Sequence, residues 1–181
     1  MKHLLVVVDM QYDFINGALF NAKAQEIVEP MRNYLENEFD GDVIIFTQDS
    51  HKEETYMKSQ EGKHLPIPHC IMYTDGWLVE RSLWQAACNN KKVKNVELLN
   101  KPTFGYAQGL MELIQSYGEI PEKITLIGTC TDICVVSNAL GLKEKFPEVP
   151  IKVIANLCAG LTEEKHEAAL EVMRSCQVEV E

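Results

Sequence analysis

The sequence of 181 residues predicts an α/β fold, with a doubly wound, mostly parallel six-stranded sheet and helices on both faces. Short apolar segments alternate with segments of helical periodicity along the whole chain, and this pattern is typical of parallel strands joined by helices. Residues 4–8 contain no polar residue, as expected of a strand covered on both faces. No repeat or linker divides the sequence, so we expect residues 1–181 to form a single domain.

The first half of the sequence predicts two strands and a long irregular stretch. After the first strand, apolar side chains at helical spacing predict a helix in which Pro30 is tolerated only in the first turn. The second strand is expected at residues 43–47. Residues 49–95 carry many turn-forming residues, with a short helix expected near residues 82–88. Loops of this length inside a compact domain are usually functional.

The second half continues the alternation of strands and helices. The expected strands are residues 96–99, 124–127, 151–155 and 177–180. The expected helices lie around residues 110–114 and from about residue 132 to residue 145. A last helix begins after Thr162, which has the character of an N-cap with acidic residues in the first turn. Its buried face is expected to consist of Leu161, Ala168, Ala169, Val172 and Met173.

Composition limits the classes of function. The net charge of -10 disfavours nucleic-acid binding, because such binding relies on Lys and Arg neutralising phosphates. No segment approaches the roughly 18 apolar residues of a membrane span, and residues 1–8 do not form a secretion signal. We therefore expect a cytoplasmic protein whose six cysteines are free thiols. The oligomeric state stays open, a homo-oligomer included.

Reactive side chains follow the expected strands. Asp9 follows the first strand, Asp49 and His51 the second, Lys101 the third, and Cys130 and Cys134 the fourth. Ligands of doubly wound sheets bind beyond the carboxyl ends of the strands, so we expect these groups to share one site. Taken singly, each has a structural explanation, such as a cap or a core thiol. Their joint placement favours a functional site.

Cys134 is the expected nucleophile. It lies in the first turn of the helix expected from Asp132, where the helix dipole lowers a thiol's pKa and free N–H groups can hold an oxyanion. Asp9 is suited to accept the thiol proton and return it to a leaving amine. Lys101 would hold Asp9 and stabilise developing negative charge. No histidine at this edge has the context of a Cys–His protease.

Five segments resemble, in order, the motifs of the isochorismatase-like cysteine hydrolases, whose nicotinamidase branch binds a metal. The segments are Val8-Asp-Met-Gln-Tyr-Asp-Phe14, Thr47-Gln-Asp-Ser-His51, Pro66-Ile-Pro-His-Cys70, Lys101-Pro-Thr-Phe104 and Gly128-Thr-Cys-Thr-Asp-Ile-Cys-Val135. The resemblance spans the whole chain. The patterns Asp-x-Gln-x-x-Phe and Gly-x-x-Thr-Asp-x-Cys-Val are highly specific as a pair.

The resemblance implies a catalytic triad of Cys134, Asp9 and Lys101. It also implies an oxyanion hole formed by the N–H groups of Cys130 and Cys134, with a cis peptide between Thr129 and Cys130. The leading reaction is the hydrolysis of a small amide, nicotinamide, to nicotinate and ammonia through a thioester on Cys134. The residues expected at the substrate are Gln11, Phe14 and Phe104, although the two phenylalanines could equally be core residues.

Asp49, His51 and His69 match the metal ligands of the nicotinamidase branch, in which the metal holds the pyridine nitrogen of the substrate. One carboxylate and two imidazoles suit a divalent zinc, manganese or iron ion. The alternative is a surface loop with two incidental histidines. His64 is a further candidate ligand, but we expect it to be an exposed loop residue. Cys70 is expected to pack rather than to bind metal.

Two departures from the family pattern leave the substrate open. No aromatic residue precedes the Pro-x-His segment, where the chain reads Lys63-His-Leu-Pro-Ile-Pro68, and Gly105 stands where many relatives have serine. A related hydrolase of the carbamoylsarcosine-amidase or isochorismatase type, acting on another small substrate, is therefore the first alternative. The alternative of another class is a noncatalytic α/β binding domain, which the complete triad disfavours.

Overall fold

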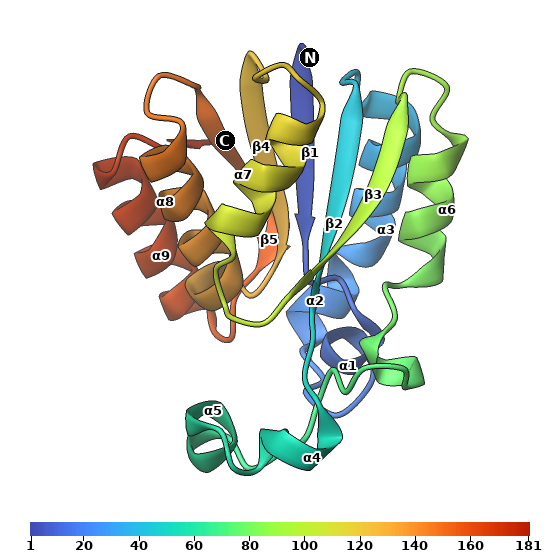
Figure 1. The fold of residues 1–181 in the computed structure, drawn as a ribbon, viewed down its shortest axis with the longest axis vertical. Helices are drawn as coiled ribbons and strands as arrows, with labels where there is room; N and C mark the ends of the chain where they lie inside the picture. Colours follow the sequence, from blue (N-terminus) through green and yellow to red (C-terminus); the bar gives the residue numbers. More distant parts are fainter.

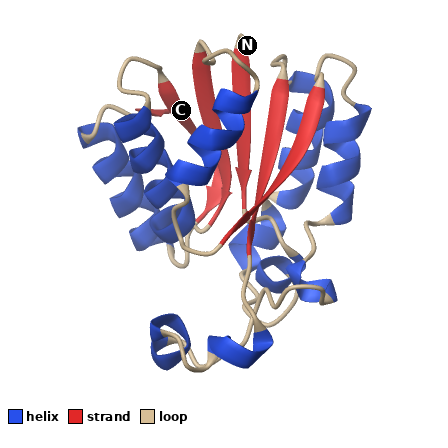
Figure 2. Cartoon of the chain, in the orientation of Figure 1, coloured by secondary structure: helices blue, strands red, loops and turns tan.

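The computed structural model describes residues 1–181 and contains one six-stranded sheet in the order β3-β2-β1-β4-β5-β6 (Figures 1 and 2). Every pair of neighbouring strands is parallel, so the predicted fold is confirmed and the sheet is parallel throughout. The strands are β1 (His3–Val8), β2 (Val43–Asp49), β3 (Asn95–Lys101), β4 (Lys123–Thr129), β5 (Ile151–Ala159) and β6 (Glu179–Val180).

Helices cover both faces of this sheet. They are α1 (Tyr12–Ile15), α2 (Ala22–Glu26), α3 (Val28–Asn33), α4 (Glu53–Tyr56), α5 (Gln60–His64), α6 (Arg81–Asn89), α7 (Ala107–Ser116), α8 (Val136–Lys145) and α9 (Glu163–Ser175). Two π-helical turns, Tyr34–Glu38 and Thr131–Val135, and a 3₁₀ turn, Asp75–Trp77, complete the elements. None of the helices has the length and apolar character needed to cross a membrane.

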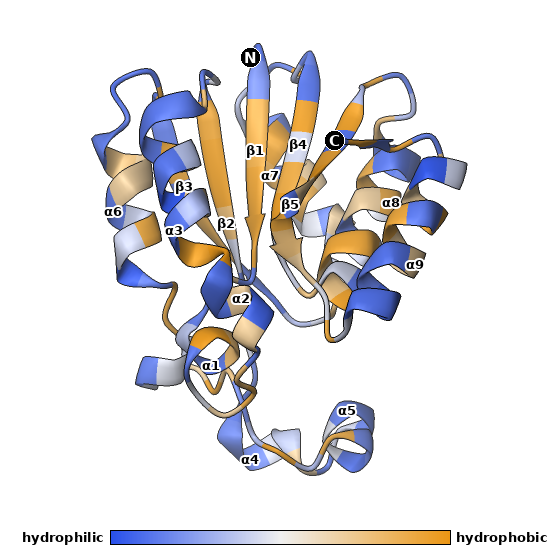
Figure 3. Cartoon of the chain, turned by 180° about the vertical axis from the view of Figure 1, so that it is seen from behind, coloured by the Kyte–Doolittle hydropathy of each residue, from blue (hydrophilic) through white to orange (hydrophobic).

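The central strands separate two hydrophobic cores. Side chains alternate between the faces of a strand, and β1 accordingly sends Leu4, Val6 and Val8 into one core and Leu5 and Val7 into the other. The first core is closed by α7, α8 and α9, and the second by α2, α3 and α6. Figure 1 shows the first helix layer in front, and Figure 3 shows the second layer over the apolar strands. Burial on both faces explains the purely apolar residues 4–8 of β1.

Local signals placed most elements correctly. Pro30 lies in the first turn of α3, where its missing N–H removes no helical hydrogen bond. Thr162 caps α9, because its hydroxyl accepts a hydrogen bond of 3.2 Å from the Lys165 N–H. All six cysteines are free, as predicted, although Cys88 and Cys176 are exposed.

The helix expected from about residue 132 to residue 145 is present but begins irregularly, and the buried face expected for the last helix is partly wrong. The helix expected from residue 132 begins as a π turn, in which the Val135 N–H bonds the Cys130 carbonyl five residues back at 3.0 Å. The regular helix starts only at Val136. The buried face of α9 is also narrower than predicted. Leu161, Ala168 and Val172 are exposed and border a shallow apolar groove, whereas Ala169, Leu170 and Met173 are buried.

Strands β1 to β5 have their carboxyl ends at one edge of the sheet, shown at the bottom of Figure 1, and α4 and α5 project beyond this edge. The strand order reverses between β1 and β4. Crevices of this kind are where doubly wound sheets bind ligands. The reactive residues predicted from the sequence follow β1 to β4 and are therefore brought to this edge.

Candidate active site

Asp9 stands at the point where the strand order reverses. It follows β1 with φ 49, a left-handed conformation that Asp tolerates better than most residues. Its carboxylate accepts a 2.7 Å hydrogen bond from the Thr47 hydroxyl, which also accepts from the Asp9 N–H at 3.2 Å. Next to it, Gly128 lies so close to β1 that a Cβ would be 2.1 Å from the Val8 carbonyl oxygen. Only glycine therefore allows β4 to approach β1 here.

The Lys101 ammonium group is the centre of the site. Its Nζ lies 2.8 Å from Asp9 Oδ2, 3.3 Å from Asp49 Oδ1 and 3.6 Å from Cys134 Sγ. It also donates to the Thr103 carbonyl oxygen at 3.1 Å. The Asp9 and Lys101 side chains are both fully buried. Strand β3 thus supplies the central nitrogen, and the end of β1, the end of β2 and the turn after β4 each place one charged or nucleophilic group beside it.

Cys134 lies in the π turn, beside the oxyanion-hole candidates. The peptide bond between Thr129 and Cys130 is cis, as the family resemblance implies. The Cys130 N–H makes no hydrogen bond within the protein. It is therefore free to bind an oxygen atom of a ligand, and a π turn at a functional site is a recurrent arrangement.

Burial decides the protonation of the thiol. The helix start at Cys134 predicts a lowered pKa, but in the structure burial, supported by Asp9, raises the pKa of the Cys134 thiol well above its ordinary value, against the opposing effect of Lys101. The expectation of a lowered thiol pKa is therefore wrong. Burial also raises the pKa of Asp9, although Lys101 opposes the shift. A neutral thiol thus lies near a carboxylate that is more basic than an ordinary Asp.

Four side chains next to this group converge as candidate metal ligands. Asp49, His51, Glu61 and His69 offer ligand atoms that lie within 4.8 Å of one another. Asp49 Oδ2 lies 3.0 Å from His51 Nε2 and 3.5 Å from His69 Nε2, and Glu61 Oε1 lies 3.5 Å from both imidazole nitrogens. Asp49 therefore faces Lys101 with one oxygen and the histidines with the other.

Hydrogen bonding and charge both fit a divalent cation in this cluster. His69 Nδ1 lies 3.0 Å from the Ile67 carbonyl oxygen, and donation to that oxygen leaves the Nε2 lone pair directed at Asp49 and Glu61. Asp9 and Asp49 contact the single ammonium of Lys101, and Glu61 adds a third carboxylate on the far side of the two histidines. With neutral histidines this excess of negative charge is costly to bury unless a cation compensates it.

A pocket of about 690 Å³ opens above these groups. Cys130, Cys134, Asp49, Glu61 and His69 form part of its wall, while the buried Asp9 and Lys101 lie beneath. The remaining wall is mainly apolar and includes Phe14, Phe20, Leu65, Phe104, Ile133 and Leu161. Phe14 packs edge-on against His69, with ring centroids 5.8 Å apart. Phe14 and Phe104 thus both lie at the pocket.

Three sequence-predicted residues lie apart from the pocket. The sequence predicts a substrate contact for Gln11, but its amide bonds the Asp49 backbone at 2.8 and 3.0 Å and the Trp77 carbonyl at 2.8 Å, and it does not line the pocket. It holds the end of β2 in place. His64 is exposed and bonds the Gln60 carbonyl, as expected. Cys70 is buried outside the metal cluster.

Sequence reasoning missed Glu61 and Thr47. Glu61 lies on α5, which begins at the Ser59 cap within the stretch expected to be irregular, and no periodicity marked it as a ligand. Thr47 could have been found, because it is the first hydroxyl residue after the apolar residues 43–46 of β2. A polar side chain in a strand covered on both faces needs a buried partner.

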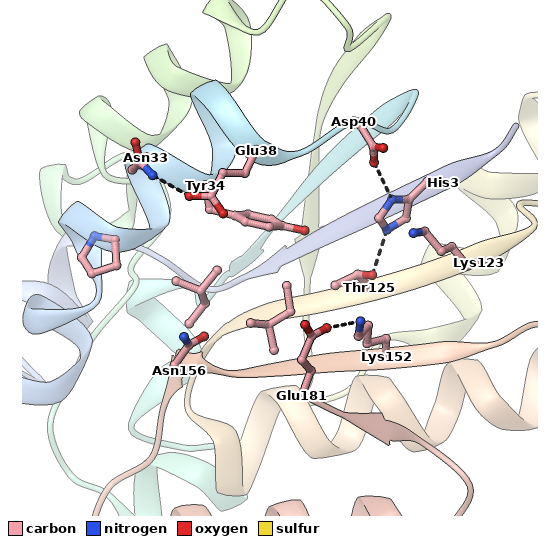
Figure 4. A pocket seen from close by; sticks show the side chains of 13 residues that line it. His3, Asn33, Tyr34, Glu38, Asp40, Lys123, Thr125, Lys152, Asn156 and Glu181 are labelled. Atoms are coloured by element: carbon pink, nitrogen blue, oxygen red, sulfur yellow. Dashed lines mark hydrogen bonds and ion pairs between the residues drawn. The ribbon is translucent and has the colours of Figure 1, made fainter.

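A second, polar pocket of about 420 Å³ lies near the amino ends of the strands (Figure 4). His3 is buried there, and its Nε2 lies 2.8 Å from the Thr125 hydroxyl. Charged groups around His3 have partners of their own. Lys152 forms an ion pair with Glu181, and the Glu38 carboxylate accepts a hydrogen bond from the Asn33 side-chain amide. No cysteine lines this pocket.

Comparisons with known proteins agree with this geometry. A family profile described as Isochorismatase domain matches residues 3–181. A nicotinamidase of Schizosaccharomyces pombe is 24% identical over 203 residues, covering 97% of this chain and 91% of that protein. The crystal structure of a nicotinamidase/pyrazinamidase from Bacillus subtilis superposes with a TM-score of 0.78 at 30% identity, covering 99% of both chains. A pyrazinamidase of Pyrococcus horikoshii in complex with zinc superposes with a TM-score of 0.76 at 24% identity, covering 100% of this chain and 99% of that one.

Proposed function

The chain belongs to the isochorismatase family, and we propose on this premise that it is a cysteine hydrolase converting nicotinamide to nicotinate and ammonia. One observation carries the proposal: Lys101 joins Asp9 and Cys134 beneath a pocket whose wall includes three of the four candidate metal ligands. Residues 1–181 act as a single catalytic domain, because both cores are built on the same sheet.

Asp9 transfers one proton in each half of the reaction. It takes the proton of the Cys134 thiol as Sγ attacks the amide carbon, and returns it to the amide nitrogen. The C–N bond then breaks, ammonia is released, and the acyl group remains on Cys134 as a thioester. A water molecule next gives a proton to Asp9 while its oxygen attacks the thioester carbon. The C–S bond breaks, the acid is released, and the proton returns to Sγ.

The surrounding groups stabilise the charges that arise. The N–H groups of Cys130 and Cys134 would hold the oxyanion of each tetrahedral intermediate, and such donors typically contribute about 3 kcal/mol. Burial alone would lower the pKa of Lys101, but Asp9, Cys134 and Asp49 hold it well above its ordinary value. Lys101 therefore stays positively charged while negative charge moves between Asp9 and Sγ.

Asp49, His51, Glu61 and His69 would hold a divalent ion, with zinc the first candidate because nitrogen and carboxylate ligands suit it. When bound, this ion supplies a Lewis acid for a ring nitrogen of the substrate. Phe14 and Phe104 offer apolar surface for the ring, which would bring the amide towards Cys134. A heteroaromatic carboxamide fits both requirements.

Ammonia release tests this proposal directly. We expect zinc-loaded protein to release ammonia and nicotinate from nicotinamide, and rapid-quench mass spectrometry to find a nicotinoyl group on Cys134. Benzamide has the same amide without the ring nitrogen, so its turnover should be at least about tenfold slower. Equal rates on both amides would contradict the role given to the metal cluster.

Other substrates separate the alternatives. Ammonia released from N-carbamoylsarcosine but not from nicotinamide would place the chain with a different amidase. A lack of turnover on every amide, in metal-loaded protein with an intact Cys134 thiol, would favour the noncatalytic binding domain.

A further inference from the structure

Asn138 is a fully buried polar residue one turn beyond Cys134. Its side-chain amide donates a 2.8 Å hydrogen bond to the Cys134 carbonyl oxygen. Buried amides are retained where their hydrogen-bonding groups are used. On this side, Asn138 satisfies a carbonyl at the junction of the π turn and α8.

The same amide reaches a second segment of the chain. Asn138 Nδ2 lies 3.2 Å from the Phe104 carbonyl oxygen, and Asn138 Oδ1 accepts a 2.8 Å hydrogen bond from the Tyr106 N–H. This segment, residues 102–106, leads from β3 to α7 across the carboxyl edge of the sheet (Figure 1). We call it the 102–106 loop. At Gly105 it packs so closely that a Cβ would be 2.9 Å from Ser137 Cβ.

The 102–106 loop contributes twice to the site. Phe104 lines the pocket, and the Thr103 carbonyl accepts a hydrogen bond from the Lys101 ammonium group. Yet residues 102–104 are exposed, and exposed loops are mobile unless hydrogen bonds hold them. Asn138 supplies two such bonds from the same side chain that bonds the backbone of Cys134.

We propose that Asn138 is a positioning residue that fixes the 102–106 loop, and with it the ring of Phe104, relative to the nucleophile. It touches neither the reacting atoms nor the pocket. The kinetic part of this inference rests on the proposed hydrolysis, whereas the structural part does not.

The test uses Asn138→Thr in the full chain. A threonine hydroxyl in a helix can bond the carbonyl four residues back, so this variant keeps a partner for the Cys134 carbonyl but is too short to hold the loop. We expect NMR-detected hydrogen exchange of the Tyr106 amide to become at least tenfold faster. We expect KM for nicotinamide to rise about tenfold, because small displacements of positioning groups weaken productive binding. Ser137→Ala, one residue away, should leave both quantities unchanged.

A double-mutant cycle with the exposed Phe104→Ala decides whether Asn138 acts through the loop. In the Phe104→Ala background, Asn138→Thr should raise KM by a factor of less than two. Unchanged Tyr106 exchange in folded Asn138→Thr, or effects on KM that multiply in the double variant, would overturn the proposal. If the unmodified protein releases no ammonia, the proposed hydrolysis fails, and the Tyr106 exchange alone decides whether Asn138 fixes the loop.

Discussion

The two pockets at opposite edges of the sheet use charge differently. The pocket near the amino ends of the strands is lined by five charged side chains besides His3, and the pocket at the carboxyl ends by only three besides His69. In the first, Asp40 and Glu181 are 74% and 67% exposed. At the second, Asp9 and Lys101 have no exposed surface. The number of charges therefore does not distinguish a reactive site.

A reactive site is distinguished instead by the burial of its charged groups and by their convergence on one point. Near the amino ends, Lys152 pairs with Glu181, and the solvent-exposed carboxylate of Asp40 lies 3.8 Å from the His3 ring. Because the acidic partner of each pair is exposed to solvent, these pairs contribute little to the stability of the fold. At the carboxyl ends, one ammonium contacts two buried carboxylates and a thiol, so each group strongly perturbs the protonation of the others. Substitutions in the two pockets should accordingly have very different effects.

The largest effect is expected from Cys134→Ala. Turnover of nicotinamide should fall by at least about 10³-fold, since no other group can form the thioester. The melting temperature should change by only a few degrees, as the side chain is small. Cys158→Ala, at another buried thiol outside the pocket, should keep activity. Steady-state kinetics and calorimetry check both, and an active Cys134→Ala variant would remove the nucleophile from the mechanism.

Asp9→Asn and Lys101→Met should each reduce turnover by about 10³-fold, because the three groups act as a unit. For the same reason, the double variant should be hardly less active than either single one. Lys101→Met should also destabilise the fold by about 3–5 kcal/mol, since it leaves buried carboxylates without their cation. Denaturant unfolding would show this loss partly restored in the double variant. Additive losses of activity would mean that the residues do not share one site.

His51→Ala is expected to lower metal content from about one equivalent and to reduce nicotinamide turnover about 10- to 100-fold. The slower turnover of benzamide should change much less. His64→Ala is the matched control, because His64 lies on the neighbouring α5 but is exposed and outside the cluster. Elemental analysis and kinetics on both amides provide the measurements. Full metal content in His51→Ala would remove His51 from the ligand set.

The smallest effect on activity is expected at the opposite pocket. Burial, helped by Lys123 and against the opposing effect of Asp40, lowers the pKa of His3 from 6.5 to about 4. The unfolded chain therefore takes up a proton between these values while the folded chain does not, and stability falls as the pH is lowered from 6.5 to 4. The loss amounts to about 3 kcal/mol.

His3→Gln should remove this pH dependence and leave nicotinamide turnover within about twofold of the unmodified protein. Urea unfolding at pH 7 and pH 5 is the measurement. An unchanged difference between the two pH values would assign the acid sensitivity to other groups. A large loss of turnover would mean that the two pockets are coupled.

The fold was accessible to sequence reasoning because its signals are local. The apolar run of β1, the Thr162 cap and the alternation of segments each depend on a few neighbouring residues. Parallel strands then bring the residues that follow them to one edge, so Asp9, Lys101 and Cys134 could be grouped before their distances were known. The metal candidates Asp49, His51 and His69 also meet as predicted.

The sequence by itself thus determined the sheet, its reactive edge and the residues gathered there. Only the tertiary structure decided that Glu61 joins the metal cluster, that Asn138 holds the 102–106 loop, and that the Cys134 thiol is neutral at rest. The first depends on contacts of Glu61 with residues 8 to 12 positions away, and the second on contacts 32 and 34 positions apart. No local periodicity marks either set. The third depends on desolvation, which is a property of the packed interior and which outweighs the helix position that the sequence reveals.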